Sequence, residues 1–228
     1  MSGVANLRDL GGIVTEDGRT LAYGRLFRSS HLAGLDAPER HRLGLRTVVD
    51  LRGAGERLAA PAGGLDDMVR QVHLPIEPRA LAQLRSVRDV DENAIIALMN
   101  GVYRRFVREQ TATWRALLRE LLSGAACPLL FHCTAGKDRT GFAAAVVLLA
   151  LDVPLDVIEE DFLLSNEHWK GRPNATGGWV TLAKVRAEYL HTAFATMQQD
   201  WGSLSNYLTL ALGMDASARA LLRDRLLA

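Results

Sequence analysis

The stretch PLLFHCTAGKDRTGFAAAVVLLAL, residues 128–151, decides the fold that the sequence predicts. Its apolar start is typical of a short buried strand, and its apolar end is typical of a buried helix. A short loop that begins at Cys133 joins the two. A strand, a tight loop and a helix in succession are the repeating unit of an α/β protein with parallel strands. The stretch therefore predicts such a fold, with Cys133 at the carboxyl end of a strand.

Segments on either side continue this alternation. RTVVDLR at 46–52 and RQVHLPI at 70–76 predict two further strands, and the helical spacing of apolar residues predicts helices over 92–108 and 113–124. From Pro154 onward the sequence indicates helix almost throughout. We expect one domain, residues 1–228, with a central, mainly parallel β-sheet of about four to five strands flanked by many helices.

Composition and charge exclude several classes of protein. The 27 basic and 26 acidic residues nearly cancel, which argues against a general nucleic-acid binder. No signal peptide is visible, and no apolar run reaches the ~20 residues that cross a bilayer. We expect a cytoplasmic protein, with leaderless export as the alternative. The sequence indicates no oligomeric state.

The two cysteines are predicted to be free thiols. In an extended strand the six steps from Cys127 to Cys133 span about 20 Å, too far for a disulfide. Cys127 is interpreted as a packing residue within the strand. The histidines at 31, 41, 73, 168 and 191 show no metal-ligand spacing, and neither a metal nor another cofactor is expected.

The loop after the strand predicts a site for an anion. A helix that begins near Arg139 or Thr140 directs its unpaired N–H groups and its partial positive charge at Cys133. The same field favours the thiolate, which is the nucleophilic form of cysteine. If the loop curls, its backbone amides and the guanidinium of Arg139 surround one point above the sulfur. Such a cup fits a tetrahedral dianion such as a phosphate monoester.

The sequence HCTAGKDRTG, residues 132–141, resembles the signature loop His-Cys-x5-Arg-Ser/Thr-Gly of cysteine-dependent protein tyrosine phosphatases. Ala-Gly-Lys-Asp-Arg within it resembles the atypical bacterial tyrosine and phosphoinositide phosphatases. Four other segments are similar to that subfamily, namely NLRDLGG at 6–12, LFRSS at 26–30, VVDLR at 48–52 and DFLLSN at 161–166. The resemblance implies a tyrosine phosphatase-like fold and hydrolysis through a phosphocysteine. Phosphotyrosine is the expected substrate, with phosphoinositides and phosphoserine or phosphothreonine as secondary ones.

The resemblance also assigns roles to individual residues. It implies Cys133 as the nucleophile, Arg139 as the clamp on the phosphate, and Thr140 as a hydrogen-bond donor to the thiolate. His132 would orient the loop from behind. The substrate-binding amides would come from Thr134, Ala135, Gly136, Lys137 and Asp138.

The general acid has two candidates. Well-known tyrosine phosphatases carry the acid in a Trp-Pro-Asp loop, a tripeptide that does not occur here. Asp138 lies within the predicted cup, and the resemblance implies this role for it, since the loop aspartate of the similar subfamily has been proposed as the acid. Asp50 ends another predicted strand, which brings it to the same edge of the sheet. We favour Asp138, and a structural role for Asp50 is the stronger interpretation.

Several alternatives stay open from the sequence. A rhodanese-like sulfurtransferase also holds an anion above a cysteine, and a non-catalytic phosphate-binding module has the same loop without turnover. Lys137 is either a solvated charge or an added contact for polyphosphorylated substrates. Arg52 and Glu56 are interpreted as surface or loop-bracing ion pairs. Segment 167–200 is either a lid or a packing helix, and the arginines at 104, 105 and 108 form either a solvated face or a peripheral membrane contact.

Overall fold

A computed structural model describes residues 3–61, 65, 67–78, 87, 89–169, 171 and 174–228. Five strands form one sheet in the order β1-β2-β5-β3-β4. All neighbours are parallel except β1, which is antiparallel to β2. The mainly parallel α/β sheet that the sequence predicts is confirmed. The strands are β1 (Arg8–Asp9), β2 (Leu26–Ser29), β3 (Thr47–Asp50), β4 (Arg70–His73) and β5 (Leu129–His132).

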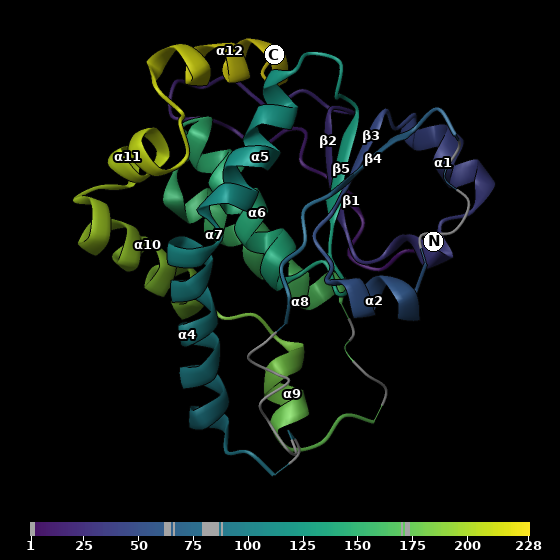
Figure 1. Cartoon of the computed structure of the whole chain (residues 1–228), viewed down its shortest axis with the longest axis vertical. Coiled ribbons are helices and arrows are strands. Elements are labelled where there is room, and N and C mark those ends of the chain that lie inside the picture. The colour runs from purple at the N-terminus through teal and green to yellow at the C-terminus, as the bar shows by residue number, and fades with distance from the viewer. Residues whose placement is uncertain are drawn as a thin grey trace.

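Helices make up most of the remaining structure (Figure 1). On the amino-terminal side lie a 3₁₀ turn at Leu32–Gly34, α1 (Ala37–Leu43) and α2 (Ala54–Ala59). The long helices follow, namely α4 (Glu92–Glu109), α5 (Thr111–Leu122), α6 (Asp138–Ala150), α7 (Leu155–Leu163) and α10 (Ala187–Trp201). Shorter helices complete the chain: α8 (Ser165–His168), α9 (Gly178–Ala183), α11 (Leu204–Asn206), a π-helical turn at Tyr207–Ala211, and α12 (Ala216–Leu226).

The two faces of the sheet belong to different apolar clusters. In β5, Leu129 and Phe131 enter the large cluster with the long helices, whereas Leu130 enters a smaller cluster with α1 and the start of the chain. This division follows from the two-residue period of a strand, which directs successive side chains to opposite faces. Figure 1 shows α4, α5, α6 and α7 on one side of the sheet and α1 and α2 on the other.

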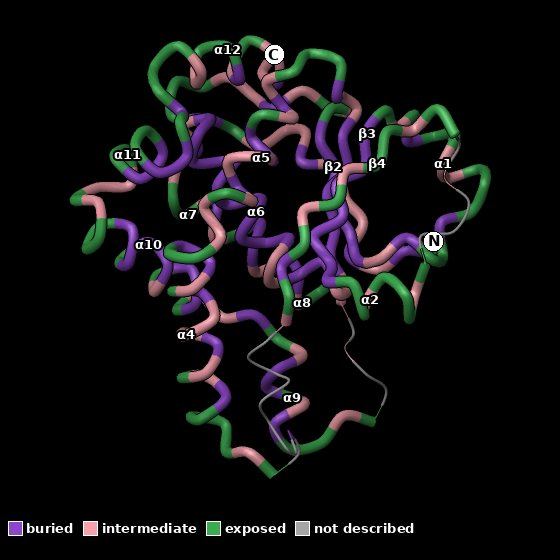
Figure 2. The backbone as a smooth tube through the Cα atoms, in the orientation of Figure 1, coloured by how far each residue is buried: buried purple, intermediate pink, exposed green. Residues whose placement is uncertain are grey.

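Helix α6 lies at the centre of the molecule. From Thr140 to Ala150 each of its residues is buried, and Figure 2 shows its tube purple along this length. Because Ala143, Ala144 and Ala145 are small, neighbouring elements approach this helix closely. A helix that is apolar on all sides must be surrounded, as the sequence predicts for this segment. The buried helix fixes the position of the loop that precedes it.

The carboxyl ends of β3 and β5 meet at one edge of the sheet. Asp50, the last residue of β3, pairs in register with His132, the last residue of β5. Cys133 follows at once, and since β5 lies between β2 and β3, the sulfur is central along this edge. In open α/β sheets ligands bind outside the carboxyl ends of the strands.

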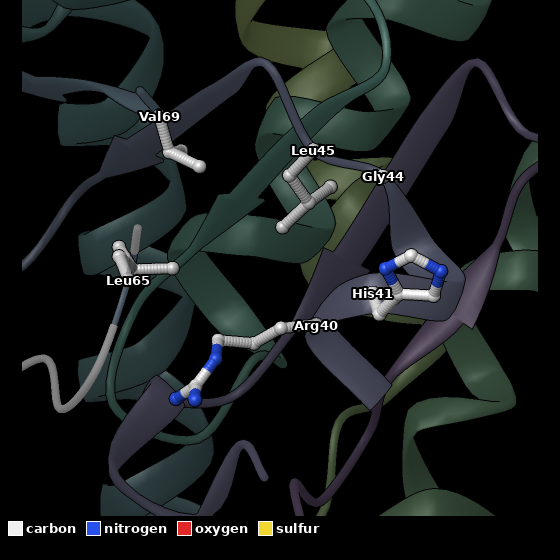
Figure 3. Close-up of a pocket in the computed structure, with 6 residues that line it drawn as sticks. All are labelled: Arg40, His41, Gly44, Leu45, Leu65 and Val69. Atoms are coloured by element: carbon white, nitrogen blue, oxygen red, sulfur yellow. The ribbon is translucent and has the colours of Figure 1, made fainter. Parts of the chain in front are cut away.

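Two hollows lie at the opposite edge. One, of about 130 Å³, lies beside the end of α1, with Leu45, Leu65 and Val69 turned toward a common space (Figure 3). Another, of about 740 Å³, is lined by residues at the starts of β3 and β4 and at the end of α5. Both are near the amino ends of the strands, so neither includes the loop at Cys133.

The two cysteines differ in their surroundings. Both are free thiols, as predicted. Cys133 is buried. Cys127 packs against the large apolar cluster, as predicted, but its expected place within a strand is wrong, because β5 begins only at Leu129. Pro128, which follows a cis peptide bond, has no N–H for the ladder, although its carbonyl accepts from Arg46 N and Thr47 N. No helix within the described residues is long and apolar enough to cross a membrane.

Candidate active site

The loop from Cys133 to Arg139 forms the candidate site. Cys133 has 2% of its surface exposed, and α6 begins at Asp138, one or two residues earlier than predicted. None of the backbone amides from Ala135 to Arg139 donates a hydrogen bond to another described residue. These amides precede or open a helix, where N–H groups lack partners within the helix. The loop thus presents a set of unused donors beside a buried sulfur, which is the arrangement expected for an anion site.

The carbonyl groups of the same loop are held from behind. His31 N donates to Thr134 O at 3.2 Å. Gly136 O accepts from Asn6 Nδ2 at 2.8 Å and from Arg28 Nη2 at 2.9 Å. When these carbonyls point outward, the amides of the same peptide units point the other way. The contacts therefore fix the curl of the loop.

Gly136 is required by the shape of this curl. Its φ is +71°, a backbone conformation that residues other than glycine rarely adopt. A Cβ atom at this position lies 2.5 Å from both C and O of Ser29. Conformation and space both demand glycine here.

A buried ionic network supports Arg28. This arginine is fully buried, and its Nη1 donates to Asp161 Oδ2 at 2.5 Å. Arg8 Nε donates to the other oxygen of Asp161 at 2.9 Å. Burial opposes ionisation of Asp161, but the charges of Arg28 and Arg8 hold its pKa below the ordinary value. The segments NLRDLGG, LFRSS and DFLLSN thus meet in one cluster behind the loop.

Glu56 holds the guanidinium of Arg139. The two form a bidentate pair, with Nη1 to Oε2 at 2.6 Å and Nη2 to Oε1 at 2.7 Å. Arg139 Nη1 also donates to Ile76 O at 3.0 Å. The hydroxyl of Thr134 donates to the same carboxylate, which in turn accepts from Gly53 N at the start of α2. The guanidinium is therefore fixed in orientation near the loop.

The expectation of a simple surface or loop-bracing pair for Glu56 is wrong, because its partner is the predicted clamp. Burial disfavours its charge, but the hydrogen bonds and charge of Arg139 lower the pKa of Glu56 to about 2. The carboxylate is thus ionised at neutral pH. The signal in the sequence is its position three residues after Gly53, where a capping box places an acid at the start of a helix.

Asp138 is contacted through both of its carboxylate oxygens. Lys137 Nζ lies 2.7 Å from Oδ2, and the hydroxyl of Tyr103 on α4 donates to Oδ1 at 3.2 Å. Lys137 is buried rather than solvated, with 6% of its surface exposed. Tyr103 is a residue of the site that the sequence reasoning missed, because only its helical spacing was visible.

Asp50 is engaged by Arg52. Its carboxylate accepts from Arg52 N at 2.9 Å, from Nε at 3.0 Å and from Nη2 at 2.8 Å. Burial raises the pKa of Asp50, but the hydrogen bonds from Arg52 outweigh it, and the pKa lies below the ordinary value. Arg52 is itself 1% exposed and donates to Ala60 O at 2.6 Å. Of its two predicted roles, it therefore has the loop-bracing one and does not form a surface pair. Asp50 reaches the predicted edge and braces a loop there.

Two further predicted residues, His132 and Thr140, are fully buried. His132 is fully buried, with Nδ1 3.2 Å from Cys133 O, and burial lowers its pKa to about 4, so the ring is neutral. Thr140 is also fully buried, and its hydroxyl has no hydrogen-bond partner among the described residues. A buried hydroxyl without a partner is unfavourable unless a ligand or a thiolate accepts from it.

The segment 167–200 contains two kinds of helix. Helix α10 packs along α4 and contributes to the core. Helix α9 also packs against α4, and in Figure 1 it lies below the sheet. For α9 the lid stays a prediction, and residues 170, 172 and 173 lie outside the described part of the chain. On α4, Arg108 pairs with Asp200 at 2.6 Å, which fits the solvated face expected there.

No group of three or more His, Cys, Asp or Glu residues suited to a metal ion occurs within the described ranges. The positive charge near the sulfur comes instead from Arg139, Lys137 and the start of α6.

Known proteins are similar to this chain in sequence. A family model described as the tyrosine phosphatase family matches residues 1–228. A Cupriavidus necator protein named as a tyrosine-protein phosphatase is 35% identical, over 94% of this chain and 84% of that protein. The triple specificity protein phosphatase PtpB of Mycobacterium tuberculosis is 33% identical, over 91% of each chain.

Solved structures with a partial likeness include Pseudomonas aeruginosa TpbA in complex with phosphotyrosine. It is 20% identical over 86% of this chain and 90% of that chain, with a TM-score of 0.37. The family match decides against the rhodanese-like alternative, since the enzymes of this family are phosphatases. The chain belongs to the tyrosine phosphatase family.

Proposed function

We propose that this phosphatase hydrolyses phosphotyrosine through a phosphocysteine formed on Cys133. The observation that carries the proposal is the loop itself, in which unused amides and the fixed guanidinium of Arg139 adjoin the buried sulfur. A thiolate at the start of a helix is a strong nucleophile, and the same donors stabilise the charge of a phosphoryl group in the transition state.

The reaction has two steps. In the first, the thiolate of Cys133 attacks phosphorus, the P–O bond to tyrosine breaks, and Asp138 gives a proton to the leaving phenolic oxygen. In the second, water attacks the phosphocysteine, Asp138 takes the proton from that water, and the S–P bond breaks. Inorganic phosphate leaves, and both the thiolate and the protonated acid are restored. Arg139 and the loop amides hold the phosphoryl oxygens in both steps.

Asp138 serves as the acid and Asp50 as a brace. Asp138 lies in the loop, and only Lys137 and Tyr103 contact its carboxylate among the described residues. Asp50 is held by three hydrogen bonds from Arg52 and stays ionised, so it has no proton to give at neutral pH. Thr140 donates to the thiolate, which supplies the acceptor that its hydroxyl lacks.

Phosphotyrosine ranks first among substrates, with phosphoserine, phosphothreonine and phosphoinositides as secondary ones. The relative PtpB is named for triple specificity, which supports a site that accepts more than one phosphate ester. Lys137 adds a buried positive charge within the loop. Together with the charge of Arg139, it favours the binding of polyphosphorylated head groups.

A substrate panel tests the proposal. The wild type and the variants Cys133→Ser, Asp138→Asn and Asp50→Asn are assayed on phosphotyrosyl and phosphoseryl peptides and on inositol lipids. We expect the wild type to release phosphate fastest from phosphotyrosine and Cys133→Ser to release none. The general acid contributes about 10²–10⁴-fold, so Asp138→Asn should lose a large part of the turnover.

Each part of the proposal is contradicted by a different result of this panel. Faster release from lipids than from phosphotyrosine reverses the ranking of substrates. Turnover by Cys133→Ser excludes a phosphocysteine. If Asp50→Asn loses all turnover while Asp138→Asn keeps it, the acid is Asp50. A wild type that binds phosphotyrosine without turnover is a binding module rather than an enzyme.

A further inference from the structure

The carboxylate of Asp138 lies between two donors of different mobility. Tyr103 reaches Oδ1 from α4, whereas Lys137 reaches Oδ2 from the neighbouring position of the loop itself. A carboxylate has two equivalent oxygens until its surroundings distinguish them, and only one of them can carry the proton that the reaction needs. The contacts of Asp138 make the two oxygens different.

Tyr103 is a rigid donor. Its side chain is fully buried, and its ring packs within about 5–6 Å of neighbouring rings. The centroid distances are 5.2 Å to Phe106, 6.3 Å to Phe142, 6.0 Å to Phe162 and 5.4 Å to Tyr189. The side chain of Tyr103 has only two torsion angles that place its hydroxyl oxygen, and this packing holds both, so the position of that oxygen is fixed. Burial and the charge of Asp138 raise the pKa of Tyr103 well above its ordinary value, so the hydroxyl keeps its proton.

Lys137 is the donor with the more flexible side chain. A lysine ammonium is a point charge on a flexible four-carbon stem, and it follows the strongest nearby anion. In the free loop that anion is Oδ2 of Asp138, at 2.7 Å. A phosphate dianion in the loop carries twice the charge, and it competes for the ammonium. When Lys137 turns to the phosphate, Oδ2 loses its partner and Oδ1 retains Tyr103.

We infer that Tyr103 is a positioning residue for the general acid: it fixes Oδ1 as the acceptor and so assigns the transferable proton to Oδ2. This inference rests on the proposed function, in which Asp138 is the acid. The proton on Oδ2 goes to the leaving oxygen in the first step and is replaced from water in the second. Tyr103 itself keeps its O–H bond throughout.

The test compares two tyrosines whose rings pack together. Tyr103→Phe removes the hydroxyl that contacts Asp138. Tyr189→Phe removes a hydroxyl with no hydrogen-bond partner among the described residues, from a ring 5.4 Å away. Both variants are assayed on phenyl phosphate, whose leaving group needs a proton, and on dinitrophenyl phosphate, whose leaving group does not. Thermal unfolding of each variant confirms that it is folded.

We expect Tyr103→Phe to lower kcat on phenyl phosphate about tenfold, the effect of losing one hydrogen bond to a charged group. On dinitrophenyl phosphate its kcat should change less than about twofold. Tyr189→Phe should match the wild type on both esters. Equal losses on the two esters indicate general damage to the site and overturn the inference.

A pH profile and a double variant add readouts that packing alone does not move. The groups that face Asp138 are Lys137, Arg139, Tyr103 from α4 and Tyr189 from α10. Without the donor at Oδ1 the ionised form of Asp138 is less stable, so the high-pH fall of kcat should move to higher pH in Tyr103→Phe. An unmoved fall contradicts the inference.

The double variant Tyr103→Phe/Asp138→Asn separates this inference from the proposed function. If Tyr103 acts through Asp138, its substitution has no further effect once Asp138 is asparagine. A full tenfold loss in that background overturns the inference and leaves Asp138 as the acid. If Asp138→Asn alone has no effect on phenyl phosphate, the assignment of the acid fails, and the role of Tyr103 fails with it.

Discussion

At the scale of single residues, the proposed chemistry depends on the guanidinium of Arg139 being held in one orientation. Arg139 reaches Glu56 through two parallel hydrogen bonds, and Glu56 is held in turn by the start of α2. A bidentate pair fixes both the position and the plane of a guanidinium. Phosphoryl transfer is limited by such positioning, because misplacement of a binding group by about 1 Å costs about 10²-fold in rate.

Substitution of Glu56 should therefore impair catalysis more than folding. In Glu56→Gln the charged partner of Arg139 is lost, and we expect kcat/KM on a phosphotyrosyl peptide to fall about 10–100-fold. Steady-state kinetics measure this fall. The matched control is Glu77→Gln, because Glu77 accepts from Ala54 N at the start of the same helix without a contact to Arg139. A similar loss in both variants assigns the effect to α2 as a whole.

At the scale of elements, the loop is held by segments distant in sequence. The carbonyl of Gly136 is bound by Asn6, ahead of β1, and by Arg28 of β2, while Asp161 of α7 binds the other end of Arg28. Each of these elements also packs in the core or the sheet. The loop between β5 and α6 therefore takes its shape from the segment before β1, from β2 and from a second helix, α7.

Asp161→Asn tests this support. The change leaves Arg28 and Arg8 buried without their anion, which destabilises a fold by about 3–5 kcal/mol. We expect that loss in denaturant unfolding, with a fall in turnover under conditions where the variant is still folded. Asp156→Asn, in the exposed first turn of the same helix, should change the free energy of unfolding by less than about 0.5 kcal/mol. Equal effects of the two changes exclude the network as the cause.

At the scale of the whole molecule, stability is linked to pH through His132. The folded state lowers the pKa of this buried ring from 6.5 to about 4, so the unfolded chain binds a proton more readily. The contribution of neutral His132 is complete above pH 6.5 and is lost as the pH falls toward 4. At about 1.4 kcal/mol per pKa unit, the upper bound is roughly 3 kcal/mol.

Unfolding by urea at a series of pH values measures this slope. We expect the free energy of unfolding of the wild type to fall between pH 6.5 and 4, and this decrease to be smaller in His132→Gln. The exposed His41 provides the control, since His41→Gln should keep the slope of the wild type. An unchanged slope in His132→Gln shows that other groups carry the acid sensitivity.

The sequence predicts those parts of the site that are local in the chain. Strand, loop and helix follow one another within residues 128–151, so Cys133 and Arg139 could be placed from the sequence alone. Glu56, Tyr103 and Asn6 could not. Their contacts with the loop span 83, 35 and 130 positions in the sequence. Only the folded chain brings these residues close to the loop. The resemblance pointed to NLRDLGG, but its purpose became clear only from the bond to Gly136.

The bond from Asn6 to Gly136 has a practical consequence for recombinant work. The amide of Asn6 also donates to His168 O at 3.2 Å, which ties the beginning of the chain to α8. Proteolytic removal of residues through Asn6, for example when a purification tag is cut off too far into the chain, would thus take away a donor to Gly136 O and loosen the loop. Expression vectors for this enzyme should carry their tags at the other terminus or behind a long spacer.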